Sequence, residues 1–523
     1  MRKWIAIGVV LVAGTAAVAQ LAIAPPAPFA DPDRRAKLAT AFADIDRLLT
    51  AFATSVHAPG AAWGIVIDGE LAHQGVMGVR DIASKAPVDA DTVFRIASMT
   101  KSFTAMSILK LRDAGKLSLD DPAERYVPEL KNLRYPSTDS PRITVRHLLT
   151  HSEGFPEDNP WGDQQLSESE EELSRMLRSG IPFSNAPGVA YEYSNYGFAI
   201  LGRIVSSVSG QPYDEYVAEN ILKPLGMSST TLHPSKVTAN QLAIGYRWED
   251  ERWKEEPALP HGSFGAMGGM LTSIRDLSRY VSAFLDAWPP RDGQETGPIR
   301  RASLREMQQP WRPSGTRVVL DKSTSAMHLT SSSYGYGLSV TQTCQYRAIV
   351  AHSGGLPGYG SLMRWLPDYG VGIIAFGNVT YTGWNNAVGG AIDRLDRTGG
   401  LRRREVRPSA ALVAARDDVS TLVVRWDDAL ADKVAAENLF LDRSKDRRRK
   451  EIDDLRAKVG TCSAPTTFDV VENALRGQWT MSCERGALQV AITLAPTMPP
   501  GVQYLAIRPA PAQPPPAGPC VSF

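Results

Sequence analysis

The chain has 523 residues, of which 43% are hydrophobic and 22% are charged, and its formal net charge is +1. This length accommodates one large domain with a smaller one, or three small domains. The balanced charge argues against nucleic acid or an anionic surface as a bulk partner.

Residues 1–24 are predicted to be a signal peptide or an N-terminal anchor. A short positive segment, MRK, precedes the apolar run WIAIGVVLVAGTAAVAQLAIA. Residues 17–19 (AVA) fit the small-x-small rule for cleavage before Gln20. The run is also close to the roughly 20 residues that span a bilayer, so an uncleaved membrane anchor stays open. Both alternatives predict export, to the periplasm or out of the cell.

The region from residue 30 to 400 is predicted to be one α+β domain. Residues 34–56 have the pattern of an amphipathic helix, and a hairpin is expected at Asp68-Gly69. Helical patterns end at Gly115 and at Gly210. Residues 334–378 contain alternating or apolar runs typical of antiparallel strands, followed by a helix at 385–397. Strands from both ends of the region therefore form an antiparallel sheet, flanked by helices and accompanied by a helical lobe.

The composition changes near residue 400, and residues 401–523 are predicted to be an accessory domain. Its first part, to about 458, is helical and highly charged, and a small β unit follows to 508, before a Pro-rich tail. Disulfides are allowed in an exported protein, and four cysteines permit three pairings. We favour Cys462 with Cys483, which are close in sequence. No spacing indicates a metal site.

The segment FRIASMTKSF places Ser98 and Lys101 three residues apart at the start of a helix, on one face. A neutral lysine can remove the proton of a serine hydroxyl if its pKa falls well below about 10.4. Alone, this spacing is more typical of two unremarkable helix residues.

Two further segments change this interpretation. Tyr193, in the sequence YSN before a helix, is a candidate base, and Asn195 can hydrogen-bond both a lysine and a substrate amide. His352 and Ser353 precede two glycines inside a strand pattern, which indicates close approach of a backbone or ligand. A backbone N–H in this segment can form half of an oxyanion hole, with the N–H of Ser98 as the other half.

S-x-x-K, Y-x-N and H-S-G occur here in the order of the motifs of serine β-lactamases and penicillin-binding proteins. Together with blocks such as ITVRHLLTHSEG and GAMGGMLTSIRDLSRY, they make residues 40–395 resemble the family that contains class C β-lactamases, DD-peptidases, D-aminopeptidases and related esterases. The resemblance implies an α/β sandwich with a helical lobe. It also implies Ser98 as the acylated nucleophile, Lys101 as base, Tyr193 as proton shuttle and Asn195, His352 and Gly355 as substrate contacts.

One departure concerns substrate choice. His352 stands where typical β-lactamases have a lysine, and with an ordinary pKa of about 6.5 it is largely neutral at pH 7. This weakens carboxylate recognition, and favours a peptidase, amidase or esterase over an efficient β-lactamase.

A second departure is the loop GFPEDNPWGDQQ. There Glu157, Asp158 and Trp161 are candidates to recognise a cationic amine beside an apolar group. The alternative is a solvated acidic loop with Trp161 packed beneath it.

The sequence therefore predicts an exported serine hydrolase that cleaves an amide or ester of a small molecule or peptide through an acyl-enzyme, without a cofactor or metal. The alternatives are a β-lactamase and a non-hydrolytic penicillin-binding sensor. The oligomeric state is left open.

Overall fold

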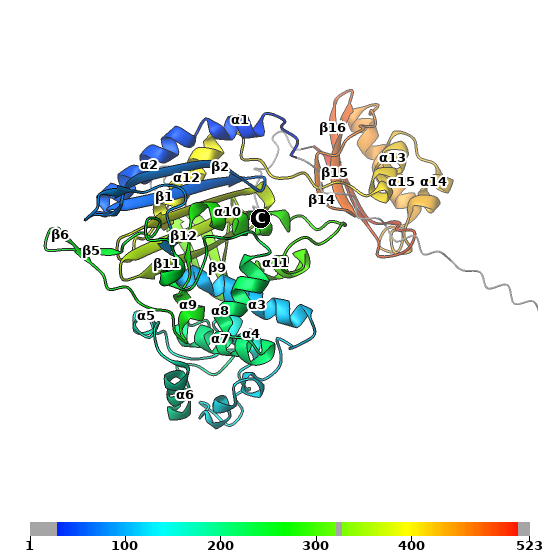
Figure 1. Ribbon diagram of the computed structural model, residues 1–523. Helices are drawn as coiled ribbons and strands as arrows, with labels where there is room; N and C mark the ends of the chain where they lie inside the picture. Colours follow the sequence, from blue (N-terminus) through cyan, green and yellow to red (C-terminus); the bar gives the residue numbers. More distant parts are fainter. Residues whose placement is uncertain (1–28, 321–326, 511–523) are drawn as a thin grey trace, which may run out of the picture.

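The computed structural model describes residues 29–320 and 327–510. Within these residues, nine antiparallel strands form one sheet in the order β3-β2-β1-β13-β12-β11-β10-β9-β8 (Figure 1). Its centre joins distant parts of the chain, because β1 pairs with β13. This confirms the predicted α+β sheet. The strands are β1 (Gly60–Ile67), β2 (Glu70–Asp81), β3 (Ala86–Pro87), β8 (Arg312–Leu320), β9 (Met327–Tyr334), β10 (Ser339–Thr343), β11 (Ile349–Leu356), β12 (Tyr359–Leu366) and β13 (Val371–Gly377).

Helices α1 (Arg34–Ala39), α2 (Phe42–Ser55) and α12 (Asn385–Arg397) cover one face of this sheet (Figure 1). The predicted helix over 34–56 is thus two helices. One apolar core lies on this face, where residues of α2 and α12 pack on alternate residues of β1 and β13. The predicted hairpin turn lies between β1 and β2, where Asp68 and Gly69 have φ of 53° and 84°.

The opposite face carries a larger apolar core, which extends into the helical lobe. Helix α10 (Ile274–Asp286) packs directly on β1, β12 and β13, and α3 (Thr100–Asp113) leads into the lobe. Both predicted helix ends are present, with Gly115 and Gly210 following α3 and α7 at positive φ. The other helices of this part are α4 (Val145–Leu149), α5 (Trp161–Gln164), α6 (Glu170–Ser179), α7 (Asn195–Ser209), α8 (Tyr213–Val217), α9 (Gly265–Gly268) and α11 (Arg301–Met307).

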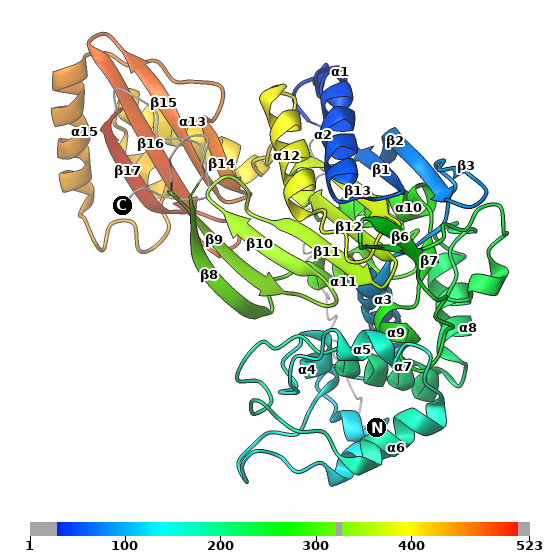
Figure 2. The same ribbon diagram turned by 90° about the vertical axis from the view of Figure 1, so that its left-hand side faces the viewer.

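The sheet is wider than the sequence patterns indicate, because β8 and β9 form a long hairpin beyond β10 (Figure 2). Nearly all side chains of β8 are exposed, so this strand lacks the apolar alternation from which strands are recognised. Among the described residues, two short strand pairs complete this part: β4 (Phe94–Arg95) with β7 (Leu271–Thr272), and β5 (Tyr246–Glu249) with β6 (Arg252–Glu255).

The described residues after 400, up to residue 510, form a separate body beside the sheet (Figures 1 and 2). Four antiparallel strands pack against three helices around their own apolar core, which includes Trp479 and Val490. A disulfide joins Cys462 to Cys483, the pair favoured from the sequence. The elements are α13 (Ala410–Val424), α14 (Asp428–Val434), α15 (Lys445–Val459), β14 (Val470–Asn473), β15 (Arg476–Cys483), β16 (Gly486–Leu494) and β17 (Val502–Pro509).

The segments with the predicted signal or anchor and most of the Pro-rich tail lie outside the described residues. In the part of the chain that is described, no helix combines the length and the apolar character needed to cross a bilayer.

Candidate active site

Ser98 lies in a short 3-10 turn, Ala97–Met99, that leads directly into α3. The preceding residue, Ala97, is held at φ 48°, in the left-handed region that non-glycine residues rarely occupy. Such strain persists only where the surrounding structure imposes it, and it is concentrated at functional sites. Ser98 itself is only 9% exposed, so it is nearly buried and does not lie on an open helix face.

Lys101 is fully buried one turn after Ser98. Its Nζ lies 3.0 Å from Ser98 Oγ, and it donates to Asn195 Oδ1 at 2.6 Å and to the carbonyl of Met267 at 2.8 Å. Burial lowers the pKa of Lys101 to about 7, against the opposing effect of the carboxylates of Asp158 and Asp163. A large fraction of Lys101 is therefore neutral at neutral pH, and can accept the Ser98 proton.

Tyr193 is the third member of this group. Its ring lies 4.8 Å from Lys101 Nζ, and its hydroxyl is in hydrogen-bonding contact with Ser98. Burial raises the pKa of Tyr193 well above its ordinary value. The phenol is therefore protonated in the unliganded site, which suits a relay that passes a proton between Ser98 and the leaving group, with Lys101 as the resting base.

His151 holds the backbone on both sides of Tyr193. Its carbonyl accepts from the N–H of Glu192 at 2.9 Å, and its Nδ1 accepts from the N–H of Ser194 at 3.1 Å. Its ring packs 4.4 Å from the Tyr193 ring. Burial, with Lys101 and His352 nearby, lowers the pKa of His151, so Nδ1 stays an acceptor. In the sequence, His151 stands in the block ITVRHLLTHSEG and was not among the predicted site residues.

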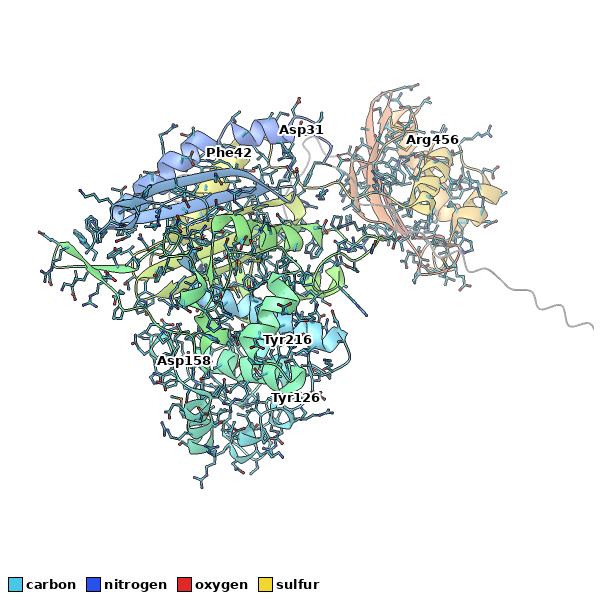
Figure 3. The ribbon with its side chains drawn as sticks, in the orientation of Figure 1. Asp31, Phe42, Tyr126, Asp158, Tyr216 and Arg456 are labelled. Atoms are coloured by element: carbon cyan, nitrogen blue, oxygen red, sulfur yellow. A yellow bond between two sulfur atoms is a disulfide. The ribbon has the colours of Figure 1, made fainter. Side chains whose placement is uncertain are left out.

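Asp158 holds the next two residues. Asp158 is labelled in the helical lobe in Figure 3. Its carboxylate accepts from the N–H of Asn195 at 2.7 Å and of Tyr196 at 2.8 Å, at the N-terminus of α7. A negative charge there is favourable because of the free amide groups and the helix dipole. Asn195 is thereby fixed toward Lys101, while its Nδ2 donates to Asn159 Oδ1.

His352 lies on β11 with its ring buried. Nδ1 contacts the carbonyl of Ser353 at 2.6 Å and so carries a hydrogen, and Nε2 accepts from the Tyr334 hydroxyl at 2.8 Å. Burial and the Lys101 charge lower the pKa of His352 to about 3, so the imidazole is neutral. A Cβ at Gly354 would fall 2.0 Å from the carbonyl oxygen of Ile96, so β11 runs against the segment that carries Ser98.

The far half of β11 has a free edge. Strand β10 pairs only with residues 349–351, whereas β12 pairs with β11 through Leu356. Among the described strands, none pairs with residues 352–356 on the β10 side. Ser353 and Gly355 lie on this free edge, which offers backbone groups to a substrate in extended conformation.

Arg364, on β12, was missed from the sequence. It lies opposite Ala351 and lines a polar cavity of about 670 Å³ with Ser353 and His352. Its guanidinium donates to Oδ1 of Asn385 at 2.9 Å, while its buried Nε has no hydrogen-bond partner. None of the described carboxylates forms an ion pair with it. A charged residue inside the apolar strand GSLMRWL is the signal from which it could have been found.

The acidic loop borders a different cavity. Glu157, Asp158 and Trp161 line a pocket of about 410 Å³ whose other walls are mainly apolar, including Phe155 and Met176. Trp161 is 47% exposed, so it is not packed beneath the loop. The backbone contacts of Asp158 occupy its carboxylate, and recognition of an amine by this residue stays a prediction.

Comparisons with known proteins place the chain in a family. The family model described as Beta-lactamase matches residues 45–396. Protein flp of Staphylococcus aureus (strain MW2) is 31% identical over 45% of this chain and 46% of its own length. Penicillin-binding protein 4* of Bacillus subtilis (strain 168) is 24% identical over 59% of this chain and 66% of its own. The matched region thus spans about half to two thirds of these relatives.

Two solved structures share the fold. An octameric penicillin-binding protein homologue from Pyrococcus abyssi aligns with a TM-score of 0.57 and 21% identity, over 87% of this chain and 96% of that one. A penicillin-binding protein from Bacillus halodurans aligns with a TM-score of 0.51 and 22% identity, over 66% of this chain and 99% of that one. The family match covers more than half of the sequence, and the chain belongs to the Beta-lactamase family.

Proposed function

We propose that the protein is a serine hydrolase that cleaves an amide or ester bond through an acyl-enzyme on Ser98. The observation that carries this proposal is the 3.0 Å contact between Ser98 Oγ and the Nζ of Lys101, whose pKa is lowered to about 7. A neutral amine at hydrogen-bond distance makes the serine hydroxyl a competent nucleophile near neutral pH.

The reaction has two steps. Ser98 Oγ attacks the substrate carbonyl and gives its proton to Lys101, and Tyr193 passes a proton to the departing amine or alcohol. The developing oxyanion is stabilised by the N–H groups of Ser98 and Gly355. Water then attacks the acyl-enzyme, its proton returns through the same groups, and Ser98 is restored.

The surroundings favour a peptidase or amidase, or an esterase. His352 is neutral and cannot form an ion pair with a carboxylate on the leaving group. Arg364, which lines the same cavity as Ser353, can supply the positive charge for this carboxylate. The free edge of β11 offers backbone hydrogen bonds to an extended peptide. A short peptide cleaved next to its free carboxyl end satisfies both features, and we propose that the enzyme acts on this class after export.

A second candidate is a protein acylated by β-lactams, either a β-lactamase or a penicillin-binding sensor. Arg364 favours it as well, since a β-lactam carries a carboxylate near its reactive carbonyl. The two classes differ in the lifetime of the acyl-enzyme.

The test profiles wild type and Ser98→Ala against a p-nitrophenyl ester, D-amino-acid p-nitroanilides, a peptide ending in D-Ala-D-Ala and nitrocefin. We expect turnover of an ester or amide that exceeds that of nitrocefin and is lost in Ser98→Ala. A fluorophosphonate or penicillin label on Ser98 that persists for hours would favour the sensor. The absence of any Ser98-dependent label or turnover would contradict both candidates.

A further inference from the structure

A hydrogen bond connects the two parts of the molecule that meet at the catalytic group, the sheet and the helical lobe. The space between these parts, where the proposed substrate binds, is called here the cleft. Tyr381, which follows β13, donates from its hydroxyl to Oδ2 of Asp163, in α5, at 2.9 Å. Tyr381 lies in the turn after β13, a central strand of the large sheet, and Asp163 belongs to the helical lobe. This contact, called here the Tyr381–Asp163 bridge, therefore connects the two parts between which the cleft lies.

On the sheet side, the Tyr381 ring covers Gly355. A Cβ at Gly355 would fall 2.6 Å from Cδ1 of Tyr381, so the aromatic ring lies directly on this residue. Tyr381 has φ 53°, and its N–H donates to the carbonyl of Tyr359 at 3.1 Å. Tyr381 remains 47% exposed. Burial of its ring in the core therefore does not explain why this strained backbone conformation is kept.

On the lobe side, Asp163 is next to the residue that packs on Asn195. A Cβ at Gly162 would fall 2.5 Å from the Cβ of Asn195. Asp163 is 3% exposed, and its charge acts on Lys101. One end of the bridge thus covers the motif residue Gly355, and the other end follows the glycine that packs on the motif residue Asn195.

The bridge also lies at a defined end of the cleft. Along β11, Ser353 and the Arg364 cavity lie on one side of Gly355, and Tyr381 lies at and beyond Gly355. A substrate whose leaving group points to Arg364 directs its acyl part toward the bridge. One residue in an extended chain advances about 3.3 Å, so a long acyl chain meets the Tyr381 ring directly after the reacting carbonyl.

We propose that the Tyr381–Asp163 bridge closes the acyl end of the cleft and restricts the enzyme to substrates with a short acyl group, such as a single amino-acid residue or a small ester. This inference rests on the proposed function. It names a specificity determinant, since the bridge selects which acyl groups reach Ser98 and takes no part in the proton transfers.

The test compares p-nitrophenyl acetate with p-nitrophenyl octanoate in wild type, Tyr381→Phe and Tyr381→Ala. The measured quantity is the ratio of kcat/KM for octanoate to that for acetate. We expect at least a tenfold rise of this ratio in Tyr381→Ala, which removes the ring, and a smaller rise in Tyr381→Phe, which removes only the hydroxyl. Tyr504→Ala is the matched control, because Tyr504 is similarly exposed (55%) but lies in the C-terminal body.

A second readout separates this inference from the proposed function. The rate at which short and long alkyl fluorophosphonates label Ser98 is followed in the same variants. If wild type is labelled but the long-to-short ratio is unchanged in Tyr381→Ala, the inference is wrong and the hydrolase proposal stands. If the wild-type protein is neither labelled at Ser98 nor able to hydrolyse an ester, the proposed function is wrong and so is this inference.

Discussion

Lys101 illustrates how burial changes the chemistry of one residue. The side chain has no exposed surface, and two of its hydrogen-bond partners, Asn195 Oδ1 and the carbonyl of Met267, are neutral acceptors. The nearby carboxylates only partly compensate for the loss of water, so the pKa falls to about 7. The same environment keeps Tyr193 protonated. The two groups therefore begin the cycle in complementary protonation states.

The first prediction is a pH profile. A base must be unprotonated, so kcat/KM for an ester should rise with pH and level off above an inflection near 7, as Lys101 loses its proton. His352, with a pKa of about 3, is neutral throughout and should contribute nothing above pH 5. Stopped-flow or steady-state rates from pH 5 to 9 measure this. An inflection near 10 would contradict it, as would loss of the inflection in His352→Asn.

At the scale of elements, the start of α7 is the part that the catalytic geometry depends on most. His151 fixes the backbone before it through Glu192 and Ser194, and Asp158 accepts the first amide groups of the helix itself. Tyr193 and Asn195 lie on either side of Ser194, so their positions relative to Ser98 are set by these contacts.

The second prediction concerns Asp158→Asn. This change keeps the shape of the side chain but removes the charge and one acceptor, and a lost N-terminal cap costs about 1 kcal/mol. We expect a lower Tm and an equal fall in kcat/KM for free-amine peptides and for their N-acetylated forms. A fall confined to free-amine peptides would instead show that Asp158 recognises a cationic amine. Ser169→Ala, which removes the cap of α6, is the control for stability alone.

At the scale of the whole molecule, most of the buried apolar residues that the structure describes fall into three groups. Two lie on the two faces of the large sheet, and the third belongs to the C-terminal body. A body with its own core and its own disulfide has the means to unfold by itself. We therefore expect the rate at which Ser98 reacts not to depend on the stability of the C-terminal body.

The third prediction tests this with Cys462→Ser combined with Cys483→Ser. The two cysteines are 21 residues apart, and the loss of such a bond costs about 3 kcal/mol. Calorimetry should show that one transition moves to lower temperature while the other stays. The rate of Ser98 labelling below both transitions should not change. Labelling that disappears together with the shifted transition would contradict the independence of the two bodies.

The features that the sequence predicted correctly are those that depend on the backbone preferences of neighbouring residues. Helix ends at Gly115 and Gly210 and the turn at Asp68-Gly69 follow from backbone preferences of single residues, and they appear where expected. The β8–β9 hairpin was missed, because its stability comes from pairing along β10 and not from an apolar face. Arg364 and Tyr381 were missed for a similar reason, since neither belongs to a motif that is contiguous in sequence.

By itself, the sequence determined the family resemblance, the sheet built from both ends of the first 400 residues, and Ser98, Lys101, Tyr193 and His352 as candidates for the site. Only the tertiary structure decided how far Lys101 is removed from water, what holds Tyr193, and which groups close the cleft. Motif spacing is fixed by covalent and helical geometry. Desolvation and cleft-spanning contacts such as the Tyr381–Asp163 bridge depend on groups that folding brings together from distant parts of the chain.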